Sequence, residues 1–467
     1  MFRPPMNRSM RTLDRAFFKK TIPTSAARIL DNKDISLCRK VLENSKEALI
    51  QNRIAPVRPD PVEEKALRGG RCIILRPEIK HDDLQTWSSK LRELHGNGTV
   101  GVIPYELHLD YSHWTYSDII QAILPAEEGD EVPTGFSLVG HVAHLNLRDR
   151  YLPYKHIIAD IIRDKNPTVQ TVINKLDRVG EENEYRTFQY EVLVGPGNLN
   201  VEVHEQGCAF RFDFAKVYWN SRLHTEHERL VSMFNEGDAI CDVMAGVGPF
   251  AVPAGKKRVF VWANDLNPES YASLTDAIKR NKVTEFVRSF NSNGHDFIRT
   301  ATSSLLQTTY SVPIYPKTKT SRSSTSIASP NPPTPLKTVV QPRIFSHYVM
   351  NLPASALTFL PSFVGLYANV PSSPNDIRKL FTPHTSVSLP MIHAYCFSTK
   401  SDNNVAQAHE ICAEISRLLG HEITPSTPET QIWDVRDVAP KKRMFCASFR
   451  LPAEVAFRTI PEGAGGL

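Results

Sequence analysis

The chain has 467 residues, enough for two or three domains that each bury a core of their own. Hydrophobic residues make up 41% and charged residues 22%, an ordinary balance for a soluble globular protein. The net charge of +5 permits an anionic partner without requiring one. The longest apolar stretch, residues 353–370, contains Pro361 and polar residues, so a broken core helix fits it better than a membrane span, and no secretory signal is visible.

The cysteines and the amino-terminal residues give information on the cellular compartment of the protein. The seven cysteines are scattered and form no CxxC pair, which argues against a disulfide framework or zinc site and favours buried thiols in a reducing compartment. Residues 1–20 are basic, with no acidic residue before Asp14, and are expected to be flexible. They fit either a mitochondrial presequence or a basic arm.

The first third of the chain predicts a small α+β domain over residues 21–135. In order, the pattern predicts a helix over 35–54, a strand over 72–75, a helix around 90–94 and a strand over 100–103. The acidic, proline-containing run 127–133 is a plausible linker.

A β-rich module is predicted for residues 136–215, where apolar and basic residues mix. A helix over 154–162 and a strand over 168–173 come first. Two runs then alternate between apolar and polar positions, which indicates a half-buried antiparallel sheet. Their apolar positions are Phe188, Tyr190, Val192, Val194, Phe210, Phe212 and Phe214.

Residues 238–265, DAICDVMAGVGPFAVPAGKKRVFVWAND, organise the remainder of the chain. A strand over 239–243 enters a glycine turn, a helix starts near Pro249, and a strand over 259–263 leads to Asp265. This order is typical of the first half of a doubly wound nucleotide-binding sheet.

The details of this turn favour S-adenosylmethionine over NAD. Gly246 and Gly248 allow a tight turn and close approach to a ligand, and Asp265 can reach two ribose hydroxyls. The turn has two glycines where the dinucleotide fingerprint has three, and Asp242 lies in the strand before it. A pyrophosphate needs an open helix N-terminus, whereas adenosine with an amino-acid tail needs a carboxylate. A glycine turn in an ordinary α/β protein is the alternative.

Further elements complete an alternating α/β domain over residues 216–467. Residues 301–342 are rich in Ser, Thr, Pro and Lys with few apolar anchors, so they are predicted to be a disordered insertion. The predicted helices cover 217–234, 271–282, 405–419 and a segment opening at 296–300. The predicted strands cover 286–290, 344–350, 391–397 and 444–451, the last after a basic turn.

Three further groups of residues could carry chemistry. Asn351-Leu352-Pro353 follows a strand and is a short match to the motif with which amino-methyltransferases grip a planar nitrogen, although Asn-x-Pro is also a common turn. Arg222 and Glu226 have the i, i+4 spacing of a plain surface ion pair. Arg186 opens an alternating strand, where an arginine is usually solvated.

Taken together, these stretches resemble the archaeal and eukaryotic tRNA (guanine-N1-)-methyltransferase family, which modifies guanosine 37 beside the anticodon. The resemblance runs from about Arg11 to Pro452, interrupted by the insertion, and rests on AKVYWNSRLHTEHERL, CDVMAGVGPF, ANDLNP, NLPASAL, LPMIHAYCF and VRDVAPKKRMFCASFRLP. It implies a Rossmann-like class I methyltransferase domain, with a mostly parallel sheet and an antiparallel last strand, and methyl transfer that supports reading-frame maintenance.

The resemblance also implies roles for single residues. Glu226 would be the general base at guanine N1 and Arg186 would steady O6. Asn351 and Pro353 would hold the guanine edge beside the methyl group. Tyr218 and Arg222 would shape the target pocket. The expected S-adenosylmethionine contacts are His227 (Arg in archaeal relatives), Asp242, Gly246, Gly248, Asp265, Leu266, Asn293, Gly294 and Asn351.

The same resemblance predicts partners and location. The β-rich module would grip the anticodon arm and the amino-terminal domain would inspect the tRNA elbow, in a monomer of the cytoplasm and nucleus with a mitochondrial pool. One rival is the related wybutosine enzyme, which transfers the aminocarboxypropyl tail, but the intact Asn351-Leu352-Pro353 argues for methyl transfer. The other is a non-catalytic tRNA-binding protein, against which Glu226 and Arg186 argue.

Overall fold

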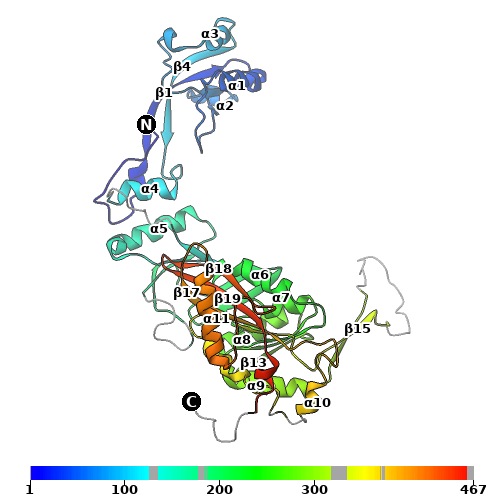
Figure 1. The fold of residues 1–467 in the computed structure, drawn as a ribbon. Helices are drawn as coiled ribbons and strands as arrows, with labels where there is room; N and C mark the ends of the chain where they lie inside the picture. Colours follow the sequence, from blue (N-terminus) through cyan, green and yellow to red (C-terminus); the bar gives the residue numbers. More distant parts are fainter. Residues whose placement is uncertain are drawn as a thin grey trace. The chain divides into compact units, whose positions relative to one another are not determined.

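A computed structural model describes residues 2–125, 135–176, 185, 187–316, 334–368, 370 and 374–459 (Figure 1). The chain forms two compact units. The first contains Met1–Phe136, Leu145–Asn174 and Val192–Pro196, and the second contains Ser137–His144, Lys175–Glu191 and Gly197–Leu467. The division between the two units runs through residues 136–215, which the sequence predicts to be one module. The three domain boundaries predicted from the sequence stay predictions.

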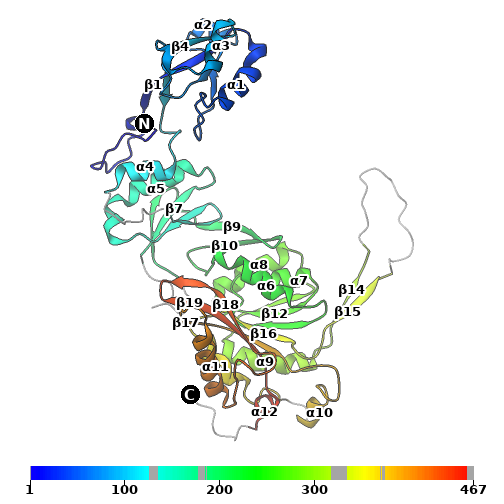
Figure 2. The ribbon, with the colours of Figure 1, turned by 45° about the horizontal axis from the view of Figure 1, so that its top comes forward.

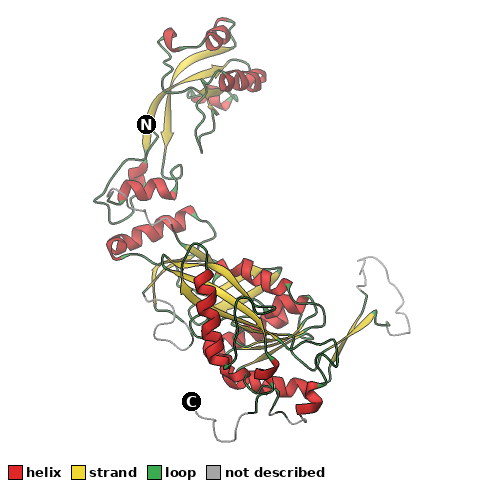
Figure 3. Cartoon of the chain, in the orientation of Figure 1, coloured by secondary structure: helices red, strands yellow, loops and turns green. Residues whose placement is uncertain are grey.

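The amino-terminal part of the first unit is built on an antiparallel sheet in the order β2-β3-β1-β4. Its buried core joins the sheet to two short amphipathic helices (Figure 3). The elements are β1 (Lys20–Ile29), α1 (Ile35–Asn44), β2 (Val57–Pro59), α2 (Glu63–Leu67), β3 (Arg71–Ile74), α3 (Ser89–Gly96), β4 (Val100–Leu109) and α4 (Tyr116–Ile123).

The helix predicted over 35–54 is shorter than the sequence pattern suggests. Helix α1 ends at Asn44, and Lys46 takes a left-handed backbone conformation with φ 57°. Ala48 then forms a β-bridge with Leu75. The apolar positions after Asn44 therefore serve the sheet, because a left-handed residue ends the helix and turns the chain back toward it.

The described part of residues 136–215 contains six short strands, one α-helix and the 3-10 helix Asp149–Tyr154, in keeping with the β-rich pattern. The strands β9 and β10 form an antiparallel hairpin in which Val201, Phe210 and Phe212 are buried. The elements are β5 (Ser137–Val139), β6 (Val142–Leu145), α5 (Lys155–Lys165), β7 (Thr171–Lys175), β8 (Tyr190–Val194), β9 (Asn200–Glu205) and β10 (Cys208–Asp213).

The second unit is dominated by a seven-stranded sheet in the order β13-β12-β11-β16-β17-β19-β18. All its strands run parallel except β19, which is antiparallel to both neighbours. The prediction of a class I methyltransferase sheet with an antiparallel last strand is confirmed. The strands are β11 (Ala239–Asp242), β12 (Phe260–Asn264), β13 (Val287–Phe290), β16 (His347–Met350), β17 (Met391–Thr399), β18 (Gln431–Ala439) and β19 (Lys442–Arg450).

Helices cover both faces of this sheet (Figure 2). One face carries α6 (His224–Ser232), α7 (Ala251–Lys256) and α8 (Pro268–Arg280), and the other carries α9 (Gly294–Gln307) and α11 (Val405–Leu419). The two shortest helices are α10 (Pro374–Arg378) and α12 (Ala453–Ala456). Because β11 pairs with β12 on one side and β16 on the other, the strand order reverses beside β11, and ligands bind at the carboxyl edge of such a point.

The predicted disordered insertion over residues 301–342 is wrong at both ends. Residues 301–307 complete α9, where Leu305 and Leu306 are buried. Strands β14 (Ser311–Ile314) and β15 (Lys337–Val340) then pair as an antiparallel hairpin, with Val312 and Val339 as its buried anchors. Val339 lies next to the main domain, since a Cβ on Gly237 would be 3.6 Å from its Cγ1. The middle of the predicted insertion, residues 317–333, lies outside the described residues.

Replacing residues 317–333 with a short Gly-Ser linker is therefore expected to leave the melting temperature unchanged. Removing all of 301–342 is expected to unfold the domain, because losing a buried leucine side chain costs about 2–5 kcal/mol and α9 would lose two. Thermal melting of both variants checks this. A collapse of the smaller deletion, or tolerance of the larger one, would contradict it.

Three other elements also differ from the sequence prediction. The helix expected over 217–234 starts later, as a 3-10 turn (Ser221–Leu223) followed by α6, because the Asn220 side chain caps it at the Arg222 N–H. The broken helix expected in 353–370 is a 3-10 helix (Ala356–Phe363) that contains Pro361. Residues 435–439, expected to belong to a basic turn, are the second half of strand β18, whose charged side chains conceal the alternation.

The cysteine prediction is confirmed as far as the structure tests it. All seven thiols are buried and none forms a disulfide. Within the described ranges, no helix has both the length and the apolar character needed to cross a lipid bilayer.

Two partly buried histidines, His144 and His347, make the second unit sensitive to acid. Burial lowers the pKa of His347 to about 4 and that of His144 to about 3. Between pH 6.5 and these pKa values, the unfolded chain binds more protons than the folded chain. The free energy of unfolding therefore decreases as the pH is lowered, by about 1.4 kcal/mol per pH unit for each histidine. His144 packs on the ring of Phe214.

His144→Phe is accordingly expected to flatten the dependence of unfolding free energy on pH between 7 and 5. Urea unfolding of the full chain, followed by tryptophan fluorescence, measures that slope. A slope equal to that of the unaltered protein would show that His144 does not contribute.

Candidate active site

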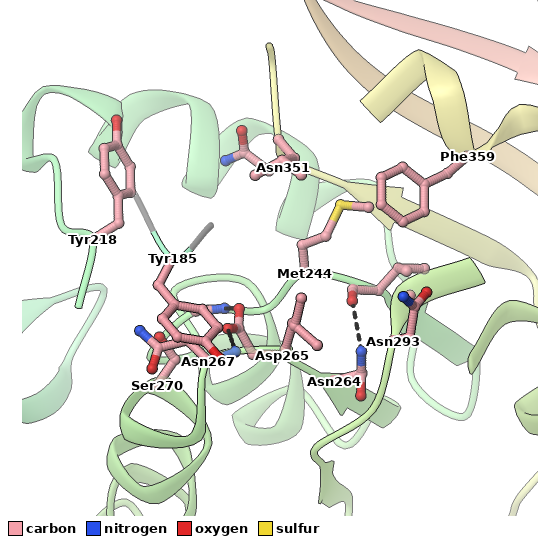
Figure 4. A pocket seen from close by; sticks show the side chains of 15 residues that line it. Tyr185, Tyr218, Met244, Asn264, Asp265, Asn267, Ser270, Asn293, Asn351 and Phe359 are labelled. Atoms are coloured by element: carbon pink, nitrogen blue, oxygen red, sulfur yellow. Dashed lines mark hydrogen bonds between the residues drawn. The ribbon is translucent and has the colours of Figure 1, made fainter. Parts of the chain in front are cut away.

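A cavity lies at the carboxyl edge of the sheet, at the strand-order reversal (Figure 4). The loops that follow β11, β12, β13 and β16 provide most of its wall. The lining residues are Tyr185, Tyr218, Val243, Met244, Gly246, Asn264, Asp265, Leu266, Asn267, Ser270, Asn293, Gly294, Asn351, Leu352 and Phe359. Six of the predicted cofactor contacts are thereby brought together from four separate loops: Gly246, Asp265, Leu266, Asn293, Gly294 and Asn351.

The glycine turn is held in place by Asp265. Its Oδ2 accepts a hydrogen bond of 2.8 Å from the Gly246 N–H, and its Oδ1 accepts one of 2.9 Å from the Asn267 N–H. Gly246 has φ 57°, a conformation that glycine adopts without strain. Burial raises the pKa of the Asp265 carboxyl above its usual value. The turn and the end of β12 are thus locked together beside the cavity.

Gly248 has a different role from the one predicted. It does not line the cavity, and its φ is 95°. A Cβ at this position would lie 2.6 Å from Cδ1 of Leu274. The glycine is therefore required by the packing of the turn against α8.

Asn293 and Gly294 form another wall. The Asn293 side chain caps α9 by accepting a 2.9 Å hydrogen bond from the His295 N–H. A Cβ on Gly294 would lie 2.9 Å from Cε1 of Phe359 and 3.1 Å from Cγ1 of Val243. Only glycine fits where the start of α9 meets the wall.

Asp242 is not a lining residue, contrary to the prediction of a direct cofactor contact. Its side chain is fully buried at the end of β11, and within the described residues neither carboxylate oxygen has a hydrogen-bond partner. Burial and, to a lesser extent, the nearby charge of Asp265 hold the pKa of the Asp242 carboxyl well above its usual value. Asp242 therefore lies at the end of β11, just before the loop whose Val243, Met244 and Gly246 line the cavity.

Asn264 is an important residue that sequence reasoning missed. Its Nδ2 donates to the carbonyls of Val243, at 3.0 Å, and Ser292, at 2.9 Å, and its Oδ1 accepts from the Ser292 N–H at 2.9 Å. It thus fixes the loops after β11 and β13. A buried polar residue just before Asp265 was the available signal. Met244 and Ser270 also line the cavity and lie close in sequence to the glycine turn and Asp265. Phe359 lines the cavity too, but no local sequence pattern marks it.

A second cavity adjoins the first and shares Tyr218, Met244, Gly246 and Asn351 with it. Its other walls are Trp219, Asn220, Leu223, His227, Ala245, Val247, Pro249 and Phe250. The His227 Nδ1 lies 2.5 Å from Glu205 Oε1, and its ring packs edge-on against Phe250. His227 therefore borders this second cavity and not the first.

Glu226 lines neither cavity. It is 4% exposed and faces the sheet, where Arg229 donates to its Oε2 and Oε1 at 2.7 Å each and the Tyr395 hydroxyl donates to Oε1 at 2.7 Å. The predicted surface ion pair between Arg222 and Glu226 is wrong, since Glu226 pairs with Arg229. Tyr395 packs against Phe250, a wall of the second cavity, so one layer of side chains separates Glu226 from that space.

The remaining predicted site residues are distributed as follows. Tyr218 is exposed and borders both cavities, as does Asn351. Pro353 borders neither, although Leu352 beside it borders the first. Arg222 is exposed on the 3-10 turn before α6, with its Nη2 3.4 Å from Ser137 Oγ. Arg186 lies outside the described residues.

Comparison with known proteins decides the family. Residues 116–198 match the TYW2 N-terminal domain, and residues 201–308 match the TRM5/TYW2 methyltransferase domain. The tRNA (guanine(37)-N(1))-methyltransferase of Phaeosphaeria nodorum is 60% identical over 464 residues, covering 98% of this chain and 100% of that protein. The chain belongs to the tRNA (guanine(37)-N(1))-methyltransferase family.

More distant members of this family keep the same length. The tRNA (guanine(37)-N(1))-methyltransferase of Schizosaccharomyces pombe is 40% identical over 451 residues, covering 96% of this chain and 95% of that protein. Among solved structures, a complex of aTrm5 with tRNALeu has a TM-score of 0.56 at 17% identity, covering 91% of this chain and all of that chain. Trm5b from Pyrococcus abyssi has a TM-score of 0.55 at 18% identity, and the match covers 91% of this chain and 99% of that chain. These structures show the shared fold.

Proposed function

We propose that this methyltransferase transfers a methyl group from S-adenosylmethionine to N1 of guanosine 37 in tRNA. The observation that carries the proposal is the paired cavities at the strand-order reversal, in a chain that matches relatives of this activity from end to end. Their shared walls, Tyr218, Met244, Gly246 and Asn351, are where a donor in one cavity and an acceptor in the other would meet.

The first cavity fits S-adenosylmethionine. A carboxylate, Asp265, borders it beside the turn of Gly246, where a ribose would lie. A Cβ at Gly246 would meet no atom within 4 Å, so this glycine leaves open space beside the carboxylate. When bound, the cofactor supplies an electrophilic methyl group on sulfur. Asn293 and Leu266 would complete the walls around it, and Asn264 keeps the loops at a fixed separation.

The second cavity would receive the guanine. Asn351 at its border would hold the guanine edge, and Tyr218 would close the outer side. The N1 proton is weakly acidic, so transfer requires a general base near N1 and a donor at O6, where negative charge develops. Glu226 and Arg186 are the proposed base and donor. Since Glu226 is bound by Arg229 and Tyr395, its side chain must turn toward the second cavity to act.

The tRNA would present guanosine 37 from its anticodon loop, where extrusion of an unpaired base is inexpensive. We assign anticodon-arm binding to residues 136–215 and elbow recognition to residues 21–135, in a monomer. We also propose a cytoplasmic and nuclear protein with a mitochondrial pool, based on the basic residues 1–20.

Mass analysis of undermodified tRNA, incubated with the protein and labelled S-adenosylmethionine, tests the proposal. A gain equal to one methyl group at guanosine 37, with the label on N1, is expected. Gain of an aminocarboxypropyl group would assign the wybutosine-type reaction, and tRNA binding without any change in mass would indicate a non-catalytic protein.

A further inference from the structure

The strand β18 carries an arginine whose direction is set by an irregularity in the sheet. Trp433 pairs with Cys446 on β19, and Cys446 pairs in turn with Tyr395 on β17. Tyr395 donates to Glu226 of α6, so this row of side chains faces α6. The contact of the Arg229 guanidinium with the Trp433 ring, 4.9 Å from its centroid, places Trp433 on the same face.

A β-bulge moves Arg436 onto that face. In a regular strand, Val435 would follow Trp433 on the α6 side and Arg436 would point away. The register instead shifts between Asp434 and Arg436, so that Arg436 pairs with Met444. Met444 lies two residues from Cys446 and shares its face. The bulge thus aims Arg436 at the α6 face, one row nearer the carboxyl edge where the cavities lie.

Arg436 lies close to a second arginine, Arg222, and to Tyr218 of the cavity wall. Burial first, and then the positive charge of Arg222, lower the pKa of the Arg436 guanidinium, while Tyr218 acts in the opposite direction. These mutual effects place Arg222 and Tyr218 close to Arg436. Tyr218 borders both cavities, so the two arginines stand at their opening.

The Asp437 carboxylate acts electrostatically on Arg436 from nearby, but Lys400 and Arg443 already bind that carboxylate. Within the described residues, neither Arg222 nor Arg436 forms a salt bridge. Arg222 donates a hydrogen bond to Ser137 Oγ, and Arg436 donates one to the Asp437 carbonyl. The adjacent Arg443 differs, since it pairs with both Asp434 and Asp437. Two close guanidinium groups that form no ion pair of their own repel each other, and an anion between them would remove that repulsion.

We propose that Arg222 and Arg436 bind a phosphodiester of the tRNA backbone at the opening of the cavities, holding the strand beside the flipped guanosine. This role rests on the proposed function. Guanidinium groups match phosphate oxygens with two parallel N–H donors, and a phosphate contact fixes register without reading sequence. The site would thus position guanosine 37 for Asn351 and Glu226 without touching the base.

Arg436→Gln is the first test, in the full chain with transcribed tRNA. The tRNA dissociation constant is expected to rise about 10-fold, and the slope of log affinity against log salt to become shallower by about 0.7, the value for one single-strand phosphate contact. S-adenosylmethionine affinity and the melting temperature are expected to be unchanged. Arg436→Lys, which keeps the charge but loses the planar fork, is expected to keep the slope and lose part of the affinity.

The matched control is Arg417→Gln. Arg417 is an exposed arginine on α11 that pairs with Glu414, away from the cavities, and its loss is expected to change neither affinity nor slope. If Arg436→Gln methylates tRNA with the affinity and salt slope of the unaltered protein, the phosphate site is wrong and the proposed function stands. If the unaltered protein methylates no tRNA, the proposed function fails instead.

A second test locates the phosphate. Anticodon stem-loop RNAs carrying one neutral methylphosphonate at each position around guanosine 37 are compared. At one position, the methylphosphonate is expected to weaken RNA binding by the unaltered protein. The same methylphosphonate should not weaken binding by Arg436→Gln any further, because that variant already lacks the phosphate contact. Equal losses in both proteins at every position would overturn the assignment.

Discussion

Glu226→Gln is expected to lower the rate of methyl transfer by about 10²–10⁴, the usual contribution of a general base, while tRNA binding is retained. Glutamine has nearly the same shape and still accepts the Tyr395 hydroxyl, but it cannot take the N1 proton. Single-turnover methylation with saturating tRNA and S-adenosylmethionine measures this step without product release.

Two comparisons separate catalysis from structure. Glu228→Gln, an exposed change two residues further along α6, should leave the rate unaltered. Arg229→Gln removes the ion pair that holds Glu226 and keeps the base itself, so it tests whether that pair restrains the carboxylate. Turnover of Glu226→Gln at the normal rate would remove Glu226 from the chemistry. A loss of S-adenosylmethionine binding together with a lower melting temperature would assign it to the packing of α6.

Asp265→Ala is expected to weaken S-adenosylmethionine binding by about 100-fold. The carboxylate now holds the Gly246 and Asn267 N–H groups, and charge-assisted hydrogen bonds each contribute about 1.5–3 kcal/mol. Its loss would release the glycine turn and also remove the proposed ribose ligand. Isothermal titration calorimetry in the absence of tRNA gives the dissociation constant directly.

A suitable control is Asp276→Ala, since Asp276 lies on the surface of α8 in an ion pair with Arg280. Exposed pairs of this kind contribute little, so cofactor affinity should be unchanged. If Asp265→Ala bound S-adenosylmethionine normally, the first cavity would not be the cofactor site.

Sequence patterns predicted most of the methyltransferase sheet because its elements are locally encoded. Helix α11 has the predicted bounds, from an amphipathic stripe that ends at Gly420 with φ 58°. Strands β11 and β12 and the turn between them followed from apolar runs and two glycines. Elements failed where local signals are weak: β18 exposes charged residues, and α1 ends at a left-handed lysine that no residue type announces.

The candidate site divides in the same way. The residues of the glycine turn, Asp265 and the cap of α9 were predictable, because each occupies a strand end and strand ends of a parallel sheet meet at one edge. Phe359 was not, because it reaches the cavity from a separate 3-10 helix.

By itself, the sequence determined most of the strands and helices of the methyltransferase sheet, the glycine turn and the family, since these depend on residue type and spacing along the chain. Only the tertiary structure decided the surroundings of Glu226 and the direction of Arg436. Spacing suggested Arg222 as the partner of Glu226, yet Tyr395 and Arg229 hold it, because β17 brings a residue 169 positions away in the chain into hydrogen-bond range. A single extra residue at the β18 bulge turned Arg436 to the opposite face, and strand pairing, which no local pattern records, fixes that choice.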